Sequence, residues 1–135
     1  MKTEQSVTLL NQAVADELVA VHQYMYFHFH LDDQGFTPLS ELFKRTAIVE
    51  MGHVDKLAER ILFLGGDVNM KPNSDVATVK DPVEILTKAS DMERQSAEFY
   101  NRAAQDCASR ADAVSKQLFE SLVQDEEEVG PKRRM

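Results

Sequence analysis

The segment G-G-D-V-N-M-K-P-N-S-D-V-A-T-V-K-D, residues 65–81, has no helical or strand periodicity and separates two halves of the chain that both show helical patterns. These 17 residues, if extended, reach roughly 55 Å at ~3.3 Å per residue. A helix of about 27 residues, the length predicted on either side, is only ~40 Å long. The segment can therefore cross from one end of a helical bundle to the other.

Capping residues, prolines and glycines divide the rest of the chain into four predicted helices. The first opens at Thr3 or Ser6 and runs to about residue 31, and the second runs from residue 37 to residue 64. Thr37 is predicted as the capping residue of the second helix, with Pro38 at its first helical position. The third helix opens at residues 81–82 and reaches about residue 108, and the fourth runs from Ser109 or Asp112 to residue 129.

The lengths of the connections predict the topology. Only about four residues join the first helix to the second and the third to the fourth, so each pair forms an antiparallel hairpin. Two hairpins joined by one long crossover make the ferritin-like variant of the four-helix bundle. We therefore predict an all-α, ferritin-like four-helix bundle over residues 1–129, followed by a short tail, residues 130–135.

Composition and charge restrict the classes of function. With 135 residues, 43% of them hydrophobic, and only five Gly and four Pro, the chain is typical of one helical globular domain. Its net charge of −8 disfavours nucleic acid or an anionic membrane as a partner. The single Cys107 excludes an internal disulfide, and neither a signal peptide nor an apolar run of ~20 residues is recognisable. We expect a cytoplasmic protein.

Each predicted helix carries an apolar stripe in steps of three and four residues, and one Glu interrupts each stripe. The four acids are Glu17, Glu50, Glu93 and Glu126. In the third helix the predicted stripe is Leu86, Ser90, Glu93, Ala97, Tyr100, Ala104 and Cys107. Buried, unpaired carboxylates cost several kcal/mol each, so four of them in one core predict a compensating cation.

The spacing of these acids predicts one site made from both hairpins. Glu17 and Glu50 are 33 residues apart, as are Glu93 and Glu126, so a pseudo-two-fold axis relates the two pairs. His53 follows Glu50 by three residues, which places both side chains on one helix face. Carboxylates with few imidazoles suit iron or manganese better than zinc. We predict a dinuclear carboxylate centre; the alternative is a core histidine among scattered acids.

Three stretches resemble the bacterioferritins: N-Q-A-V-A-D-E-L-V-A-V-H-Q-Y at 11–24, V-E-M-G-H-V-D-K-L-A-E-R-I-L-F-L-G-G at 49–66, and D-E-E-E at 125–128. Bacterioferritins are iron-storage proteins that assemble from two-fold dimers into hollow 24-subunit shells. The resemblance implies a ferroxidase that oxidises Fe(II) with O2 or peroxide at a di-iron centre. It further implies that Glu17 and His53 hold one iron, that Glu93 holds the other, and that Glu50 and Glu126 bridge them.

Met51 has two interpretations. Its position beside the stripe indicates a packing residue or a small interface, whereas the resemblance implies an axial ligand of haem b, with one haem per two subunits. Tyr24, seven residues after Glu17, is interpreted as a packed core residue, although the resemblance allows a contact with the metal ligands. His28 lies ~16 Å along the first helix from Glu17, too far to join the site.

The chain departs from the family at its C-terminal end. The bacterioferritins have a His where this chain has Val129, so we expect weaker binding of the second iron and reduced ferroxidase activity. Asp125, Glu127 and Glu128 are expected to point about 100° or more away from Glu126 around the helix, so none replaces that His. From the resemblance we also expect a fourth helix shorter than that of the family and no fifth helix. Two alternatives stay open: a catalytically weak, haem-carrying cage subunit, and a rubrerythrin-like di-iron peroxidase.

Overall fold

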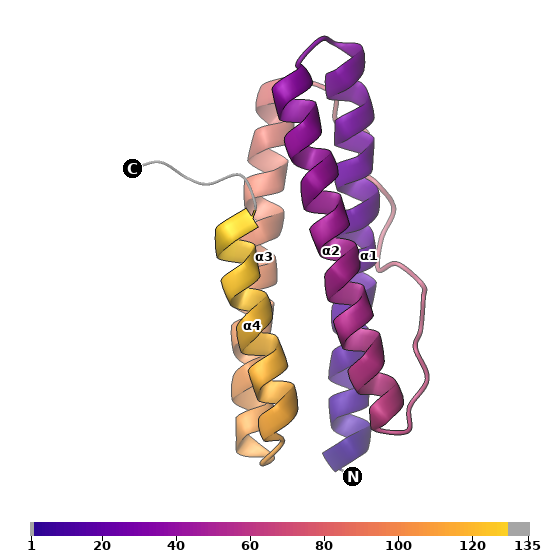
Figure 1. The fold of residues 1–135 in the computed structure, drawn as a ribbon, viewed down its shortest axis with the longest axis vertical. Coiled ribbons are helices and arrows are strands. Elements are labelled where there is room, and N and C mark those ends of the chain that lie inside the picture. The colour runs from indigo at the N-terminus through magenta and orange to yellow at the C-terminus, as the bar shows by residue number, and fades with distance from the viewer. Residues whose placement is uncertain (1, 130–135) are drawn as a thin grey trace.

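The computed structural model describes residues 2–129, apart from the side chains of Lys2, Glu128 and Val129. Its four helices are α1 (Lys2–Asp33), α2 (Thr37–Phe63), α3 (Pro82–Ser109) and α4 (Ala113–Val129). They form two antiparallel hairpins, α1–α2 and α3–α4, and the long connection between α2 and α3 climbs the full length of the bundle (Figure 1). The prediction of an all-α, ferritin-like bundle is thereby confirmed. The predictions for the tail, residues 130–135, lie outside the described part of the chain.

Most helix ends follow from the predicted capping residues. The Asp81 side chain accepts a hydrogen bond from the backbone N–H of Glu84 at 3.1 Å and so caps α3. At the end of α2, Gly65 adopts a positive φ of 84°, and the N–H of Gly66 donates to the carbonyl of Ile61 at 3.0 Å. A left-handed residue with this back-bonding pattern terminates a helix and favours glycine.

Two predicted helix starts are wrong. Phe36 rather than Thr37 precedes the first turn of α2, because the Phe36 carbonyl already accepts the N–H of Ser40 at 2.9 Å; no side chain caps this helix. In the first helix, Thr3 and Ser6 are both inside α1, which extends from residue 2 to residue 33. Ser6 does not cap this helix but is buried and donates to Asp112 at 2.6 Å.

Side-chain amides of α1 hold the crossover against the bundle. Asn11 donates to the carbonyl of Asp67 and accepts from the N–H of Asn69, both at 2.9 Å. Further along α1, Gln23 donates to the carbonyl of Ala77 at 3.0 Å and accepts from its N–H at 2.8 Å. An amide side chain offers both a donor and an acceptor, so it can pair with an extended backbone as a neighbouring strand would. These bonds fix the route of a segment that has no secondary structure of its own.

The core consists of two apolar clusters. All four helices build the first cluster, which contains Leu10, Leu57, Tyr100, Phe119 and Leu122 among others. The second is built by α1, α2 and α3 alone and contains Tyr24, Phe27, Phe43, Ile85 and Ala89 among others. Figure 1 shows the reason, because α4 ends about halfway along α3. Among residues 2–129, only α1, α2 and α3 therefore pack together at the end where α3 begins.

The predicted stripe of α3 is wrong in this three-helix part. Leu86 is 38% exposed, whereas Ile85 and Ala89 are fully buried. Among residues 2–129 no part of α4 lies beside the first turns of α3, so this end of α3 packs only against α1 and α2. The buried face of α3 is consequently shifted by one residue at this end, to Ile85 and Ala89. None of the four described helices is both long and apolar enough to span a membrane.

Asp112 joins the start of α4 to the other hairpin. It accepts hydrogen bonds from Ser6 of α1 at 2.6 Å, from Arg60 of α2 at 3.0 Å, and from the backbone N–H of Ser115 at 3.2 Å. Burial alone raises the pKa of Asp112, but its hydrogen bonds with Ser6, Ser115 and Arg60 lower that pKa to about 2. The carboxylate therefore caps α4 and fixes its first turn against α1 and α2.

We expect Asp112→Ala to lower the free energy of unfolding by about 3 kcal/mol, because it removes a helix cap and leaves the guanidinium of Arg60 without its carboxylate in a largely buried position. Chemical denaturation followed by circular dichroism measures this change. Glu120→Ala is the matched control on α4, since Glu120 forms only an exposed ion pair with Lys116 and its loss should cost less than about 0.5 kcal/mol. Equal losses in the two variants would contradict the prediction.

Candidate metal centre

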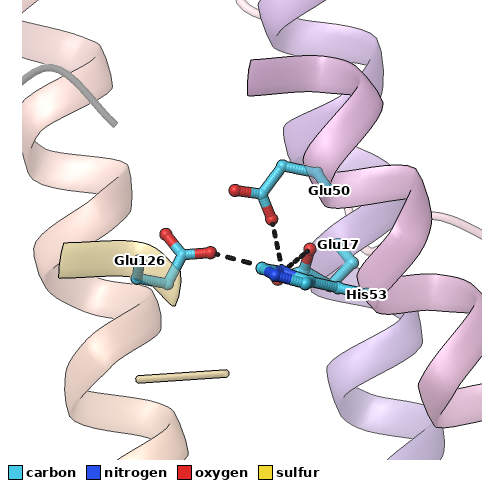
Figure 2. Close-up of side chains that lie close together, drawn as sticks. All are labelled: Glu17, Glu50, His53 and Glu126. Atoms are coloured by element: carbon cyan, nitrogen blue, oxygen red, sulfur yellow. Dashed lines mark hydrogen bonds and ion pairs between the residues drawn. The ribbon is translucent and has the colours of Figure 1, made fainter. Parts of the chain in front are cut away.

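Four buried polar side chains converge inside the bundle. Glu17 comes from α1, Glu50 and His53 from α2, and Glu126 from α4. One ligand atom from each lies within 4.8 Å of all the others, and we call this set the four-residue cluster. Figure 2 shows the three carboxylates directed at the ring of His53. The predicted spacing therefore brings together one acid from each of three helices and the only histidine placed on the predicted site.

His53 is at the centre of this arrangement. Its Nδ1 lies 3.1 Å from Oε2 of Glu50, 3.2 Å from Oε2 of Glu17 and 3.7 Å from Oε1 of Glu126 (Figure 2). The other ring nitrogen, Nε2, lies 3.1 Å from Oδ2 of Asp125. One ring nitrogen thus faces three carboxylates and the other faces a fourth, Asp125, which also pairs with the exposed Lys56 at 3.9 Å, so carboxylates are in excess around the imidazole.

The excess of carboxylates changes the proton affinity of the cluster. Burial, followed by a hydrogen bond with Glu17 and repulsion by it, raises the pKa of Glu50 to about 8. Burial and repulsion by Glu50 raise the pKa of Glu126 to about 9. Burial alone lowers the pKa of His53, but hydrogen bonds and attraction to Glu17 and Glu50 raise it to about 11. At neutral pH, protons on Glu50, His53 and Glu126 therefore reduce the repulsion between the carboxylates of the metal-free cluster.

A metal ion fits this donor set. The Oε1 atom of Glu126 is buried and has no hydrogen-bond partner, although buried carboxylate oxygens normally have one. A cation between the four residues would supply that partner and release the protons of Glu50 and Glu126. Three carboxylates with one imidazole suit iron or manganese better than a structural zinc site.

Glu93, the fifth predicted ligand, is not part of the four-residue cluster. It lies half-buried on α3, and its Oε1 is shielded from solvent. Burial, followed by the charges of Glu93 and of the three cluster carboxylates, raises the pKa of Tyr24 well above its ordinary value. Tyr24 itself is 1% exposed and its ring packs against Phe27 and Phe43, as expected for a core residue.

Two residues that contact the cluster, Tyr100 and Asp125, are not among the site residues predicted from the sequence. Tyr100 donates its hydroxyl hydrogen bond to Oε1 of Glu17. The available signal was its spacing, since Tyr100 follows Glu93 by seven residues just as Tyr24 follows Glu17. Asp125 was rejected as a ligand because of its angle from Glu126, and it does lie outside the four-residue cluster. It nevertheless reaches the far nitrogen of His53, a contact that orients a ligating imidazole.

Met51 lies on α2 away from the cluster and is 51% exposed. One turn earlier, Ile48 is 53% exposed on the same face. Between Met51 and His53, a side chain added at Gly52 would meet only open space. The thioether therefore stands on an exposed, partly apolar surface rather than in the core of this chain.

Comparisons with known proteins agree with this geometry. Residues 7–129 match the family described as "Ferritin-like domain". A bacterioferritin from Rhodobacter capsulatus is 38% identical over 90% of this chain and 75% of its own length, and one from Desulfovibrio desulfuricans is 36% identical over 90% and 68%.

Two solved bacterioferritin structures share the fold. The R. capsulatus protein, solved with a metal-free dinuclear site and haem iron in a crystallographic special position, superposes with a TM-score of 0.88 at 35% identity over 92% of this chain and 78% of that one. The D. desulfuricans protein, whose diiron site was studied in different catalytic states, gives a TM-score of 0.90 at 34% identity over 93% and 73%.

We expect the thermal midpoint of the metal-free protein to fall as the pH rises from about 5 to about 9. The raised pKa values of Glu50, Glu126 and His53 mean that the folded cluster keeps protons which the unfolded chain has released. Their stabilising contribution is complete below the unfolded pKa values and is lost as the pH rises through the folded ones. Calorimetry of metal-free protein across this range measures the slope.

Glu126→Gln should flatten this pH dependence, because the amide resembles the protonated acid and cannot lose a proton. Glu127→Gln, one residue further along α4 and exposed, is the matched control and should keep the wild-type slope. A midpoint that rises with pH in the metal-free wild type would contradict the proton assignment.

Proposed function

Because this chain belongs to the ferritin-like family and, within it, to the bacterioferritins, we propose that it oxidises Fe(II) at the four-residue cluster and stores the Fe(III) product inside a protein shell. The observation that supports this most directly is the buried donor set itself. Three carboxylates surround one imidazole in the core, and one of their oxygens has no hydrogen-bond partner. Fe(II) is the substrate, and O2 or peroxide accepts its electrons.

The residues of the chain bind the iron and manage its charge. The carboxylates of Glu17, Glu50 and Glu126 neutralise the incoming cation, and Glu50 and Glu126 give up protons as it binds. Asp125, about one-third exposed, holds the far side of the His53 ring, so that Nδ1 faces the metal. Two Fe(II) ions together supply the two electrons that reduce O2, with two protons, to hydrogen peroxide. Glu93 is the further ligand proposed for the second ion, which Glu50 and Glu126 would share.

The two halves of this centre are unequal. A step of 76 residues leads from Glu17 to Glu93 and from Glu50 to Glu126. The same step leads from His53 to Val129, and from Val49 to Asp125. The residues that correspond to His53 and Asp125 are thus Val129 and Val49. Where the first iron position has a polar contact, the second has two valines. We therefore expect the ion held by Glu17 and His53 to bind more tightly than the second, and the ferroxidase activity to be reduced.

The test is O2 consumption after Fe(II) is added to the metal-free protein. We expect the wild type to consume O2 slowly, Glu126→Gln to abolish this activity, and Val49→Asp combined with Val129→His to raise the rate by about tenfold or more through the restored ligand and its carboxylate partner. His28→Gln, outside the cluster, serves as the control and should match the wild type.

Complete absence of O2 consumption by the wild type, with full activity in the double variant, would favour the alternative of a haem-carrying cage subunit without its own ferroxidase activity. The two valines are the observation that favours this second candidate. If the wild type and the double variant both take up iron but neither oxidises it, the proposed reaction is contradicted.

We further propose that Met51 is an axial ligand of haem b, shared with the Met51 of a second copy, so that one haem is bound per two subunits. The exposed Met51, the neighbouring Ile48 and the open space at Gly52 would leave room for a large apolar group on this face of α2. Haem with thioether ligands has a raised potential and would carry electrons to stored Fe(III). Such dimers would build a 24-subunit shell in the cytoplasm.

We expect the purified protein to show a Soret band at one haem per two chains, and Met51→Leu to lose this band, because leucine has no ligating sulfur. Met70→Leu is the matched control, since Met70 is 59% exposed on the crossover and away from α2. Visible absorption with a haem assay measures the stoichiometry. Equal haem contents in the two variants would rule out Met51 as the ligand.

A further inference from the structure

We propose that Tyr100 is a positioning residue of the metal centre: its hydroxyl holds one oxygen of Glu17, so that only the other oxygen faces His53 and the bound metal. This inference rests on the proposed function, because it concerns the ion held by the four-residue cluster. It adds a residue to the centre and assigns Glu17 a single ligating oxygen.

The two oxygens of Glu17 have different partners. Oε1 accepts the hydrogen bond of the Tyr100 hydroxyl, whereas Oε2 lies 3.2 Å from Nδ1 of His53. Figure 2 shows this carboxylate turned towards the ring of His53. Glu17 and Tyr100 are each 1% exposed, so water does not compete for either oxygen. A carboxylate with one oxygen held by a neutral donor offers its other oxygen to a cation in a fixed direction.

The ring of Tyr100 is rigidly held, which makes its hydroxyl a fixed reference point. It stacks on Phe119 of α4 with ring centroids 6.0 Å apart, and it meets Phe99 edge-on at 5.7 Å. The rest of the ring lies in the apolar cluster that all four helices share. Only the hydroxyl end of the side chain reaches the four-residue cluster, at Glu17. Ligand geometry at a metal site depends on this kind of support from packed neighbours.

The contact also joins the two hairpins. Tyr100 belongs to α3, while the oxygen that it holds belongs to α1, 83 residues earlier. The 76-residue step that relates the two halves leads from Tyr24 to Tyr100, so each half carries a tyrosine seven residues after a predicted ligand, Glu17 or Glu93. The tyrosine of the second half thus contacts a cluster residue of the first half, whereas the position that corresponds to His53 is Val129.

The experiment compares Co(II) binding by the full-length wild type and Tyr100→Phe, which removes only the hydroxyl and keeps the ring. Co(II) reports both affinity and geometry, because its visible absorption depends on the number and arrangement of its ligands. We expect Tyr100→Phe to bind Co(II) about tenfold more weakly, a typical effect of losing a partner of a metal ligand. We also expect a changed spectrum, because the freed Oε1 atom of Glu17 then competes for the metal.

Two controls separate this role from packing. Phe119→Leu disturbs the same ring stack but leaves the hydroxyl in place, and Tyr26→Phe removes a hydroxyl from a ring that packs beside His30, away from the cluster. Both should keep the wild-type spectrum and an affinity within about twofold. Thermal denaturation of each metal-free variant is measured first, and the titrations are run well below the lowest midpoint, so that every variant is folded.

An unchanged spectrum and an affinity within about twofold of the wild type in Tyr100→Phe would overturn the assignment of Tyr100 while leaving the metal centre intact. The same losses in Phe119→Leu would also overturn it, because they would show that packing alone is responsible. Failure of the wild type itself to bind Co(II) would contradict the metal centre and, with it, the role of Tyr100.

Discussion

The burial of three carboxylates around one imidazole is the constraint on which the rest of this bundle depends. Taking such charges out of water costs several kcal/mol each unless protons or a cation compensate them. Without metal, His53 and the shared protons of Glu50 and Glu126 provide that compensation, as their raised pKa values indicate. The stability of the bundle must then come from the two apolar clusters of the core rather than from the four-residue cluster.

Much of the fold and part of the site could be predicted because they depend on local sequence. Asp81 and Gly65 act within one helical turn, so their effects can be read without knowing the tertiary structure. The acids at 17, 50 and 126 share a register because helices have a constant rise. Leu86 was misplaced because its environment depends on how far α4 extends, which no local pattern records. Asp125 lies outside the four-residue cluster, as its helix angle predicts, but its contact with the far nitrogen of His53 depends on tertiary packing that the angle does not record.

The unequal halves of the bundle show how a duplicated architecture can divide its tasks. The contact of His53 with Asp125 crosses from α2 to α4, and the contact of Tyr100 with Glu17 crosses from α3 to α1. The α3–α4 hairpin thus contributes both Tyr100 and Asp125, and both contact cluster residues of the α1–α2 hairpin. Val129, which stands at the position corresponding to His53, and Val49, which corresponds to Asp125, both lie outside the four-residue cluster. The cluster itself draws three residues from the first half and Glu126 from the second, and Tyr100 and Asp125 of the second half contact it.

The crossover has a consequence for the order of folding. Three members of the four-residue cluster belong to the α1–α2 hairpin, which closes over a short turn, whereas Glu126 arrives only when the second hairpin docks. The bonds from Asn11 and Gln23 to the crossover link residues 54 to 58 positions apart, and such distant contacts form late because closing long loops costs entropy. Before the second hairpin docks, a nascent chain would hence hold only Glu17, Glu50 and His53 of the four-residue cluster, exposed to solvent. The complete cluster therefore requires the second hairpin to be docked against the first.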